Sequence, residues 1–418
     1  MSVRTFVIAG GGLAGARAAE SLRAEGFGGR IIIVAAENHY PYFRPPLTKT
    51  FLAGIVGRAA VDVHVRGWYA DHRIGVLRGS PVTKLALDTH RLAMADGRTL
   101  HYDKLLLATG ASPRRFTGPG SELAGVHHLR TVTQAESLRA ELAGGGRRVV
   151  VLGAGWIGLE VAAVARRYGN AVTVLGRGRM PLPGVVGEAV GAVFAGLHRE
   201  NGVDLRLGVA VAELTGCQGR VTGVLLADGE VLPVDVVVVG IGVVPNDGLA
   251  CDAGLHVDDG IVVDAAFRST DPDVYAVGDV ASVFHPVLGR HLRIEHSVNA
   301  ELTGAAVGRS MLDQAVSYDS IPYFSTDQFD LAMEYSGYGD LARKADVVFR
   351  GDRARRRFVA FWLLDGRVVA GMNVNVGDVN KTVQAIIRSG LRFDPHLLGN
   401  ESIALDGLLA AAAADKGN

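Results

Sequence analysis

The sequence predicts an α/β protein with two dinucleotide-binding units, followed by a smaller mixed α+β domain. Three observations predict this fold class. A strand, a GxGxxG turn, a helical pattern and a second strand occur at residues 5–37 and again at residues 147–177. A further short apolar strand ends at Gly278 and Asp279, and the composition changes to alternating apolar and polar residues after residue 317. With 418 residues the chain is too long for one compact core.

Composition excludes several classes of function. The formal net charge is +0, which gives no reason to expect nucleic acid or an anionic membrane as a partner. The two cysteines, Cys217 and Cys251, form no CxxC pair and cannot act as the dithiol of a disulfide reductase. No apolar run reaches membrane-spanning length, and "MSVRTFVIAGGG" enters a strand without a signal-peptide pattern. We therefore expect a cytoplasmic protein.

The two glycine motifs predict two Rossmann-like units. In the first unit, Gly10, Gly12 and Gly15 permit a tight turn, close approach to a pyrophosphate and packing of the helix on the strand. Glu37 follows the second strand, where an acid accepts hydrogen bonds from ribose hydroxyls. The second unit has the same glycine pattern, at Gly153, Gly155 and Gly158. Two bound dinucleotides are most economically a flavin and a nicotinamide, because hydride transfer needs contact at about 3 to 3.5 Å.

The segment "TDPDVYAVGDVA", residues 270–281, assigns the flavin to the first unit. Asp279 ends a short strand, where its carboxylate can accept a hydrogen bond from a ribitol hydroxyl. We expect a helix to begin directly afterwards, with its N-terminus facing the pyrophosphate. A nicotinamide dinucleotide has no ribitol. "YDKLLLATGASP" and "VDVVVVGIGVVPN" are the expected crossover strands of the two units.

Taken together, these residues resemble the FAD-dependent NAD(P)H:ferredoxin reductases that serve Rieske oxygenases and cytochromes P450, related to putidaredoxin reductase and apoptosis-inducing-factor-like flavoproteins. The resemblance rests on both glycine motifs, "PYFRPPLTK", "GWIGLE", "VYAVGDVA", "EHSVNA" and "MNVNVGDV". It implies a glutathione-reductase-like arrangement. An FAD domain of residues 1–112 and 243–320 is interrupted by an NAD(P) domain of residues 113–242, and residues 321–418 form a domain that covers the flavin.

The resemblance also implies site residues. Lys49 and Glu160 match a pair near the hydride-transfer point, where the lysine favours negative charge on reduced flavin and the glutamate orients the lysine and the nicotinamide amide. Arg44 and Pro45 match the loop beside the isoalloxazine. The remaining positions that the resemblance assigns to the cofactors are Leu13, Ala14, Val82, Ala108, Thr109, Gly110, Arg130, Trp156, Ile157, Gly242, Gly278, Ser297 and Phe324. No metal site is expected.

The stretch "VTVLGRGRM", residues 172–180, departs from the family pattern. Relatives have a glutamate where this chain has Gly176, and Arg177 and Arg179 follow at once. A guanidinium binds a 2'-phosphate, which a glutamate would repel, so we expect NADPH to be preferred to NADH. The alternative is a weakened or lost nicotinamide site, which would leave a non-catalytic flavoprotein.

Three further positions, Ser297, Ser325 and Gly377, lack the tryptophan that close relatives tend to carry. By the resemblance, Ser297 and Ser325 lie near the isoalloxazine, where their small side chains would leave space. This favours a second hypothesis: a flavoenzyme that acts directly on a small organic substrate in an open, apolar-lined pocket. The first hypothesis is hydride transfer from NAD(P)H to FAD and single-electron transfer to an acidic ferredoxin. Arginines at 353 and 355–357 would attract such a partner. The sequence leaves a homodimer open.

Overall fold

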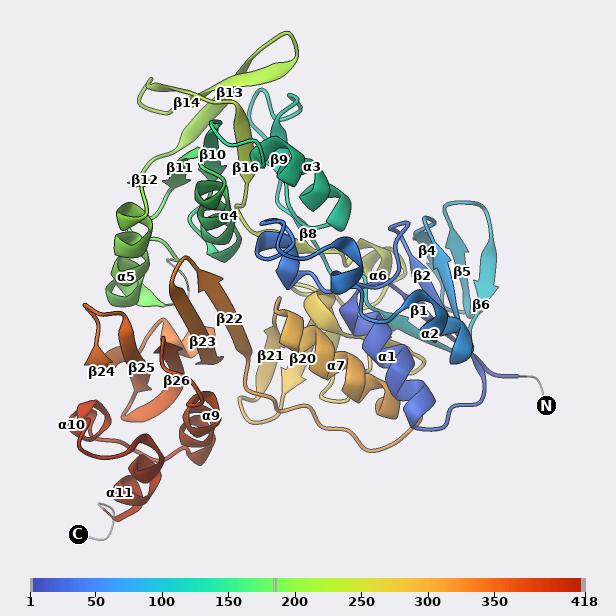
Figure 1. Ribbon diagram of the computed structural model, residues 1–418. Helices are drawn as coiled ribbons and strands as arrows, with labels where there is room; N and C mark the ends of the chain where they lie inside the picture. The colour runs from blue at the N-terminus through green and yellow to red at the C-terminus, as the bar shows by residue number, and fades with distance from the viewer. Residues whose placement is uncertain (1–2, 183, 185, 415–418) are drawn as a thin grey trace. The chain divides into compact units, whose positions relative to one another are not determined.

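The computed structural model describes residues 3–182, 184 and 186–414, and the chain divides into two compact units (Figure 1). Unit 1 comprises residues 1–46, 56–112 and 243–320, and unit 2 comprises residues 47–55, 113–242 and 321–418. The four predicted domain segments are a finer division than these units and stay a prediction. In the described ranges, no helix is both long enough and apolar enough to cross a bilayer.

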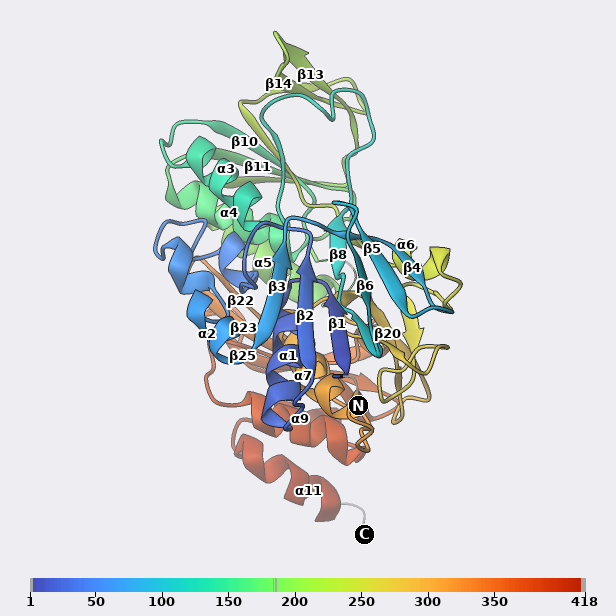
Figure 2. The same cartoon turned by 90° about the vertical axis from the view of Figure 1, so that its right-hand side faces the viewer.

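Unit 1 is built on a parallel sheet with the strand order β19-β7-β1-β2-β3, whose strands β1, β2 and β3 lie side by side in Figure 2. Strand β1 is "TFVIA", and four of its five residues are buried, as expected for a parallel strand covered on both faces. Helices α1 and α7 pack against each other in the same unit (Figure 1). The strands of this sheet are β1 (Thr5–Ala9), β2 (Arg30–Ala35), β3 (Ile74–Arg78), β7 (Lys104–Leu107) and β19 (Val274–Ala276), and the two helices are α1 (Leu13–Ala24) and α7 (Ser297–Ser310).

The rest of unit 1 consists of short helices and small sheets. Strands β4-β5-β6 form an antiparallel sheet, β18-β20-β21 form a mixed sheet, and β8 pairs with β17. These elements are η1 (Pro45–Thr48), which continues into unit 2, η2 (Arg58–Val61), α2 (Arg66–Asp71), β4 (Val82–Ala86), β5 (Arg91–Met94), β6 (Thr99–His101), β8 (Ala111–Pro113), β17 (Val243–Pro245), α6 (Gly248–Asp252), β18 (Ile261–Val263), η3 (Gly278–Val280), β20 (Ala281–His285) and β21 (Arg290–Arg293).

The expected helix after Asp279 is absent from the described chain. A single 3-10 turn, η3, is followed by strand β20, because the buried residues Ala281–Val283 form part of the central strand of the β18-β20-β21 sheet. The prediction was wrong because a Gly-Asp turn precedes a strand as readily as a helix. The next helix, α7, begins at Ser297.

Unit 2 contains a second parallel sheet with the order β12-β11-β10-β16-β9, which confirms the second Rossmann-like unit. Strands β10 and β16 are almost entirely buried valine and leucine. The elements are β9 (Val126–His128), α3 (Val132–Leu142), β10 (Arg148–Leu152), α4 (Trp156–Arg167), β11 (Ala171–Gly176), α5 (Gly187–Glu200), β12 (Val203–Leu207), β16 (Val236–Val239), and an antiparallel sheet of β13 (Val211–Cys217), β14 (Arg220–Leu226) and β15 (Val231–Pro233).

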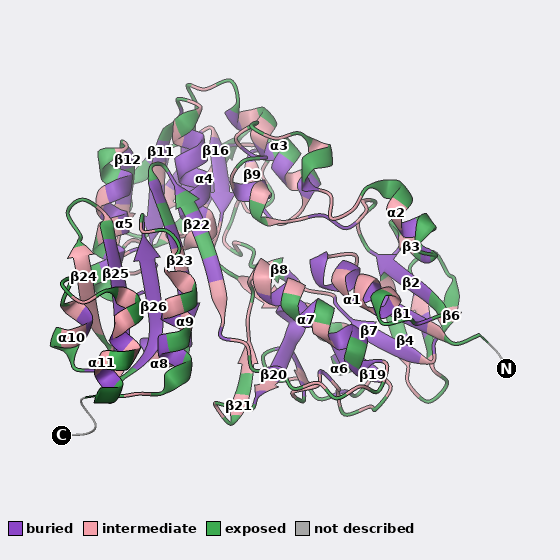
Figure 3. Cartoon of the chain, turned by 60° about the horizontal axis from the view of Figure 1, so that its bottom comes forward, coloured by how far each residue is buried: buried purple, intermediate pink, exposed green. Residues whose placement is uncertain are grey.

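The end of the chain forms the predicted mixed α+β part of unit 2. An antiparallel sheet has the order β22-β23-β26-β25-β24, and β25 and β26 are largely buried (Figure 3). Asp365 and Gly366 both have positive φ, which is the geometry of a type I' hairpin turn. The elements are β22 (Tyr323–Gln328), β23 (Leu331–Gly337), α8 (Gly339–Ala342), β24 (Asp346–Asp352), β25 (Arg357–Leu364), β26 (Arg367–Val374), α9 (Asn380–Ser389), α10 (Pro395–Gly399), η4 (Leu405–Gly407) and α11 (Leu408–Ala414).

Candidate functional site

The three glycines of the unit 1 glycine loop have different surroundings. Gly10 has φ +133°, and a Cβ atom there would lie 2.1 Å from the carbonyl oxygen of Ala108. A Cβ atom on Gly15 would lie 2.4 Å from the carbonyl oxygen of Gly10. Gly12, by contrast, has no protein atom within 4 Å of its Cβ position, and it begins α1 without a side-chain cap. The outer glycines are therefore required by the fold, and the middle one leaves space where a phosphate can meet the helix N-terminus.

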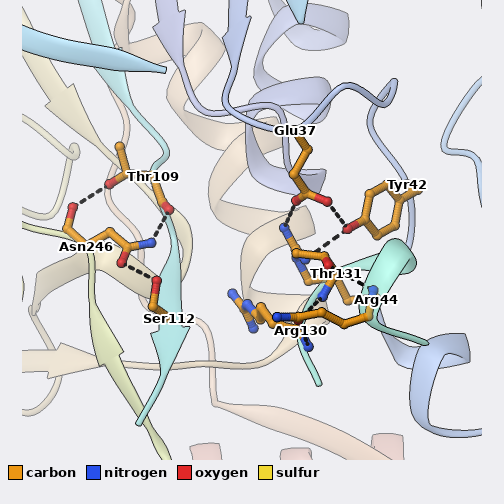
Figure 4. Close-up of polar contacts among 9 residues, drawn as sticks. Glu37, Tyr42, Arg44, Thr109, Ser112, Arg130, Thr131 and Asn246 are labelled. Atoms are coloured by element: carbon orange, nitrogen blue, oxygen red, sulfur yellow. Dashed lines mark hydrogen bonds and ion pairs between the residues drawn. The ribbon is translucent and has the colours of Figure 1, made fainter. Parts of the chain in front are cut away.

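Glu37, at the end of the second strand, is held by two neighbours in unit 1 (Figure 4). Tyr42 donates its hydroxyl to Oε2 of Glu37 at 2.6 Å, and the guanidinium of Arg44 lies 2.9 Å from Oε1. Arg44 also donates to the hydroxyl oxygen of Tyr42 at 3.1 Å. The carboxylate is thus oriented in advance, with lone pairs left on both oxygens for a ribose. The sequence alone did not predict the contact between Arg44 and Glu37.

The Gly278–Asp279 turn packs onto the start of α1. Gly278 has φ +74°, and a Cβ atom there would lie 3.1 Å from the Cβ of Ala14. Its N–H donates to the hydroxyl of Thr303 on α7 at 3.2 Å, and the carboxylate of Asp279 is mostly buried. Burial lowers the pKa of His296, the residue before α7, to about 4, so this imidazole is neutral at pH 7.

Asn246 fastens the place where the chain leaves and re-enters unit 1 (Figure 4). Its side-chain amide donates to the carbonyl of Thr109 at 2.8 Å, and its side-chain oxygen accepts from the hydroxyl of Ser112 at 2.7 Å. The hydroxyl of Thr109 donates to the carbonyl of Asn246 at 2.8 Å. Sequence reasoning missed this asparagine, although its motif "VVPN" ends the second crossover strand.

The glycine loop of unit 2 repeats the arrangement of the first. Gly153 has φ +112°, and a Cβ atom there would lie 2.2 Å from the carbonyl oxygen of Gly240, while one on Gly158 would lie 2.1 Å from the carbonyl oxygen of Gly153. Gly155 has no protein atom within 4 Å of its Cβ position and begins α4 without a side-chain cap. The same open middle position therefore occurs twice in the chain.

Strand β11 ends at Gly176, the position where relatives have a glutamate, and Arg177 and Arg179 follow it. Gly176 is buried, and a Cβ atom there would lie 2.9 Å from Cδ2 of Leu207 and 3.1 Å from the Cβ of Ala154. Arg177 and Arg179 are exposed and make no ion pair or side-chain hydrogen bond to the residues that the structure describes. Both guanidinium groups are therefore available to an anion.

Lys49 and Glu160 come together within unit 2. The Nζ atom of Lys49 lies 3.4 Å from Oε1 of Glu160 and donates to the carbonyl of Ser325 at 3.3 Å. The hydroxyl groups of Thr48 and Thr326 also donate to the carboxylate of Glu160, on opposite oxygens. Burial raises the pKa of Glu160, and Lys49 and the two threonines oppose that shift.

The segment that carries Thr48 and Lys49 is held against the second Rossmann-like sheet of unit 2. The hydroxyl of Tyr168, at the end of α4, donates to the carbonyl of Leu52 at 2.9 Å. The guanidinium of Arg139 on α3 lies 5.9 Å from the ring centre of Phe51. Residues 47–55 therefore contact both α3 and the C-terminal end of α4, the helix that carries Glu160.

Aromatic side chains surround the start of α4. Trp156 meets Phe324 edge to face, with ring centres 5.0 Å apart, and Phe194 at 5.4 Å. Ile157 follows Trp156 in the first turn of α4 and is half-buried.

Two further predicted site residues of unit 2 make backbone hydrogen bonds. Arg130 precedes the capping box of α3, and its N–H donates to the side-chain oxygen of Gln134 at 2.9 Å. The carbonyl of Gly242 accepts from the N–H of Arg114 at 2.8 Å.

The structure groups the predicted site residues into two sets, one in each unit. The unit 1 set contains Gly10, Gly12, Leu13, Ala14, Gly15, Glu37, Arg44, Pro45, Val82, Ala108, Thr109, Gly110, Gly278, Asp279 and Ser297. The unit 2 set contains Lys49, Arg130, Gly153, Gly155, Trp156, Ile157, Gly158, Glu160, Arg177, Gly242 and Phe324. Their roles at a bound cofactor stay predictions.

Ser325 and Gly377 line one hollow on the C-terminal sheet of unit 2. Its volume is about 390 Å³, and its wall includes Tyr323, Asp327, Glu334 and Asn373. Glu334 accepts hydrogen bonds from Tyr323 at 2.7 Å and from Asn373 at 3.0 Å. The wall also includes the apolar residues Ala332, Met333 and Val376, so it is mixed and only partly matches the open, apolar-lined pocket that the small-molecule hypothesis predicts.

Two family models match the chain. Residues 4–304 match the model described as pyridine nucleotide-disulphide oxidoreductase, and residues 323–409 match the one described as reductase C-terminal. The ferredoxin--NAD(+) reductase component of the anthranilate 1,2-dioxygenase system of Burkholderia cepacia is 40% identical over 97% of this chain and 99% of its own. Putidaredoxin reductase CamA of Pseudomonas putida is 37% identical over 98% of this chain and 97% of its own.

A solved structure also matches nearly the whole chain. The putidaredoxin reductase in a covalent putidaredoxin reductase-putidaredoxin complex matches with a TM-score of 0.93 and 36% identity, over 98% of this chain and 99% of that chain. These matches confirm the resemblance and the fold class that the sequence predicts. The chain belongs to the pyridine nucleotide-disulphide oxidoreductase family and carries the reductase C-terminal domain.

Proposed function

We propose that this protein is an FAD-dependent oxidoreductase that takes hydride from NAD(P)H and passes single electrons to a ferredoxin serving an oxygenase or a cytochrome P450. The observation that carries this proposal is the repeated glycine loop with an open middle glycine, at Gly12 and Gly155. The relatives named as ferredoxin reductase components support the choice of acceptor. Bound FAD supplies the conversion of a two-electron donor into single electrons.

In this proposal the chain contributes binding, orientation and charge. The open N-termini of α1 and α4 each accept a pyrophosphate, and Glu37 accepts hydrogen bonds from a ribose. Lys49 presents a cation whose position is fixed by Glu160 and by the carbonyl of Ser325. Such a cation favours negative charge that develops next to it during hydride transfer.

We assign NADPH as the preferred donor. The two arginines after Gly176 are exposed and lack ion-pair partners in the described chain, which suits a doubly charged 2'-phosphate. A glutamate in place of Gly176 would repel that phosphate. Because relatives are named as NAD(+) enzymes, this preference would distinguish the chain from them.

Only part of the basic surface in the C-terminal domain is available to an acidic ferredoxin. Arg356 forms an ion pair with Glu200, and Arg355 lies 3.6 Å from Asp352. Arg353 stacks over Phe349 and makes no ion pair to the residues described, so it is the better candidate for steering a partner. The cytoplasmic location also remains a prediction, based on the reduced cysteines.

An anaerobic reduction experiment tests the proposal. The purified yellow protein is mixed separately with NADPH and NADH, and bleaching of the flavin absorbance is followed by stopped flow. Fast bleaching by NADPH, followed by reoxidation on adding a ferredoxin, is the expected result. Bleaching only by an organic substrate would favour the small-molecule flavoenzyme, and no bleaching by either nicotinamide would mean that the second glycine loop has lost its ligand.

A further inference from the structure

A chain of buried polar side chains runs from Glu160 to a histidine on α5, entirely within unit 2. Thr326 donates its hydroxyl to Oε1 of Glu160 at 2.5 Å. Gln328, two residues further along β22, donates its amide to the hydroxyl oxygen of Thr326 at 3.2 Å. The side-chain oxygen of Gln328 lies 2.8 Å from Nε2 of His198. Thr326 and Gln328 are 1% exposed and His198 is fully buried.

With the side-chain amide of Gln328 oriented as in the structure, the chemistry of these groups gives each hydrogen bond a direction. An amide oxygen only accepts, so Nε2 of His198 must carry the hydrogen, and the NH₂ group of Gln328 then faces Thr326. Because the NH₂ group of Gln328 offers no acceptor, the hydroxyl of Thr326 directs its hydrogen to Glu160. His198 Nδ1 has no hydrogen-bond partner in the described chain, which agrees with a neutral Nε2–H tautomer. Donors therefore point toward the carboxylate along the whole chain.

The fold does not by itself require polar side chains at positions 326 and 328. Strand β22 alternates, and Thr326 and Gln328 both face the interior, where apolar residues would pack without a hydrogen-bonding requirement. At the other end, the rings of His198 and Phe329 meet at a steep angle, with their centres 5.2 Å apart. Buried polar groups are costly unless they are hydrogen-bonded, and each group between Nε2 of His198 and Glu160 has a partner. Among the described hydrogen bonds, the one from Thr326 to the carboxylate of Glu160 links these side chains to the proposed site.

We propose that Gln328 and His198 are positioning residues for hydride transfer: they commit the hydroxyl hydrogen of Thr326 to Glu160 and so keep that carboxylate ionised and oriented. The inference rests on the role proposed above for Glu160. A protonated Glu160 could donate to Thr326 only if the hydroxyl hydrogen of Thr326 turned away from the carboxylate, and the NH₂ group of Gln328 offers that hydrogen no acceptor. The ionised form is consequently favoured, against the effect of burial.

The test uses Gln328→Met in the FAD-loaded protein, because methionine has a similar volume and no donor. Isotope-edited infrared spectroscopy with ¹³C-labelled glutamate follows the Glu160 carboxyl against pH, and the band is identified by its loss in Glu160→Gln. We expect the pKa of Glu160 to rise by about one unit in Gln328→Met. Anaerobic flavin reduction should slow about tenfold, with the KM for the nicotinamide unchanged.

Gln384→Met is the matched control. Gln384 on α9 donates to the hydroxyl of Ser336, which donates to Asn380, so it repeats the amide-to-hydroxyl arrangement without any link to Glu160. This control should change neither the infrared titration nor the reduction rate. If Gln328→Met fails to retain FAD, Thr326→Val and Thr326→Ser test the same link, because only serine keeps the hydroxyl.

The outcomes separate the inference from the proposed function. An unchanged Glu160 titration in both Gln328→Met and Thr326→Val would overturn the inference, whatever the rates. If Glu160→Gln reduces its flavin as fast as the parent, the proposed role of Glu160 fails, while the infrared shift still measures the positioning effect. In the Thr326→Val background, Gln328→Met should have no further effect on the titration, and an additional shift would contradict the order of the chain.

Discussion

Replacing Gly155 with alanine should separate nucleotide binding from folding. Gly155 has φ −87° and ψ −178°, an extended conformation that any residue adopts, and its Cβ position has no protein neighbour within 4 Å. Alanine at a helix N-cap costs about 1 kcal/mol relative to glycine. For a domain of this size that corresponds to a fall in Tm of about 2 to 4 °C.

The effect on the nicotinamide should be much larger. A methyl group at this point occupies the path by which a phosphate reaches the N–H groups of α4. Loss of about two charge-assisted hydrogen bonds, each worth roughly 1.5 to 3 kcal/mol, raises the KM for NAD(P)H by about 100-fold or more. Stopped-flow flavin reduction against nicotinamide concentration measures this change, while absorbance confirms that FAD remains bound.

Two controls make the result decisive. Gly57 begins η2 with nearly the same backbone angles and the same empty surroundings, so Gly57→Ala should leave the KM unchanged. Gly153→Ala should fail to fold, because its Cβ would lie 2.2 Å from a carbonyl oxygen at φ +112°. A Gly155→Ala protein with the parent's KM would refute the assignment of this loop to the dinucleotide.

Three further predictions concern charge. Lys49→Met should slow flavin reduction about tenfold or more with FAD still bound, and unchanged reduction kinetics would remove the role proposed for Lys49. Arg177→Glu should move the ratio of kcat/KM for NADPH and NADH about tenfold toward NADH, whereas Arg167→Glu, an exposed change at the opposite end of α4, should not. Burial lowers the pKa of His198 below the value near 6.5 of an unfolded histidine, so the unfolded chain binds the extra proton as the pH falls through 6.5 and stability declines. The fall in Tm between pH 7.5 and pH 5.5 should therefore be smaller in His198→Gln than in the parent, and an equal fall would contradict this account.

Local sequence patterns predicted the Rossmann-like units because each depends on neighbours along the chain. A buried strand, three glycines and a helix occupy about 30 residues, and the open space at Gly12 and Gly155 agrees with the task predicted for a middle glycine. The hairpin at Asp365 and Gly366 was predictable for the same reason, since both residues tolerate positive φ.

Contacts between distant residues were not predictable in this way. Thr326 and Glu160 are 166 residues apart, and Gln328 and His198 are 130 apart, so no spacing rule connects them. Composition alone also did not predict that charged and polar residues would share the wall of the hollow at Ser325, because Glu334 and Asn373 lie on other strands. The helix expected after Asp279 was wrong, since a strand in a separate sheet uses the same apolar residues.

The hydrogen bonds around Asn246 have a consequence for how such a protein can be rearranged. The chain leaves unit 1 at residue 112 and returns at residue 243, and the N–H of Asn246 donates to the carbonyl of Gly110 at 2.9 Å beside the side-chain contacts of Thr109 and Ser112. An inserted segment whose two ends are bonded together in the host can be replaced by that of a relative without opening the host sheet, provided that its contacts with residues 47–55 and 321–418 are kept. Residues 113–242 could accordingly be exchanged between relatives, which would transfer a nucleotide preference while the strands of the host sheet keep their order.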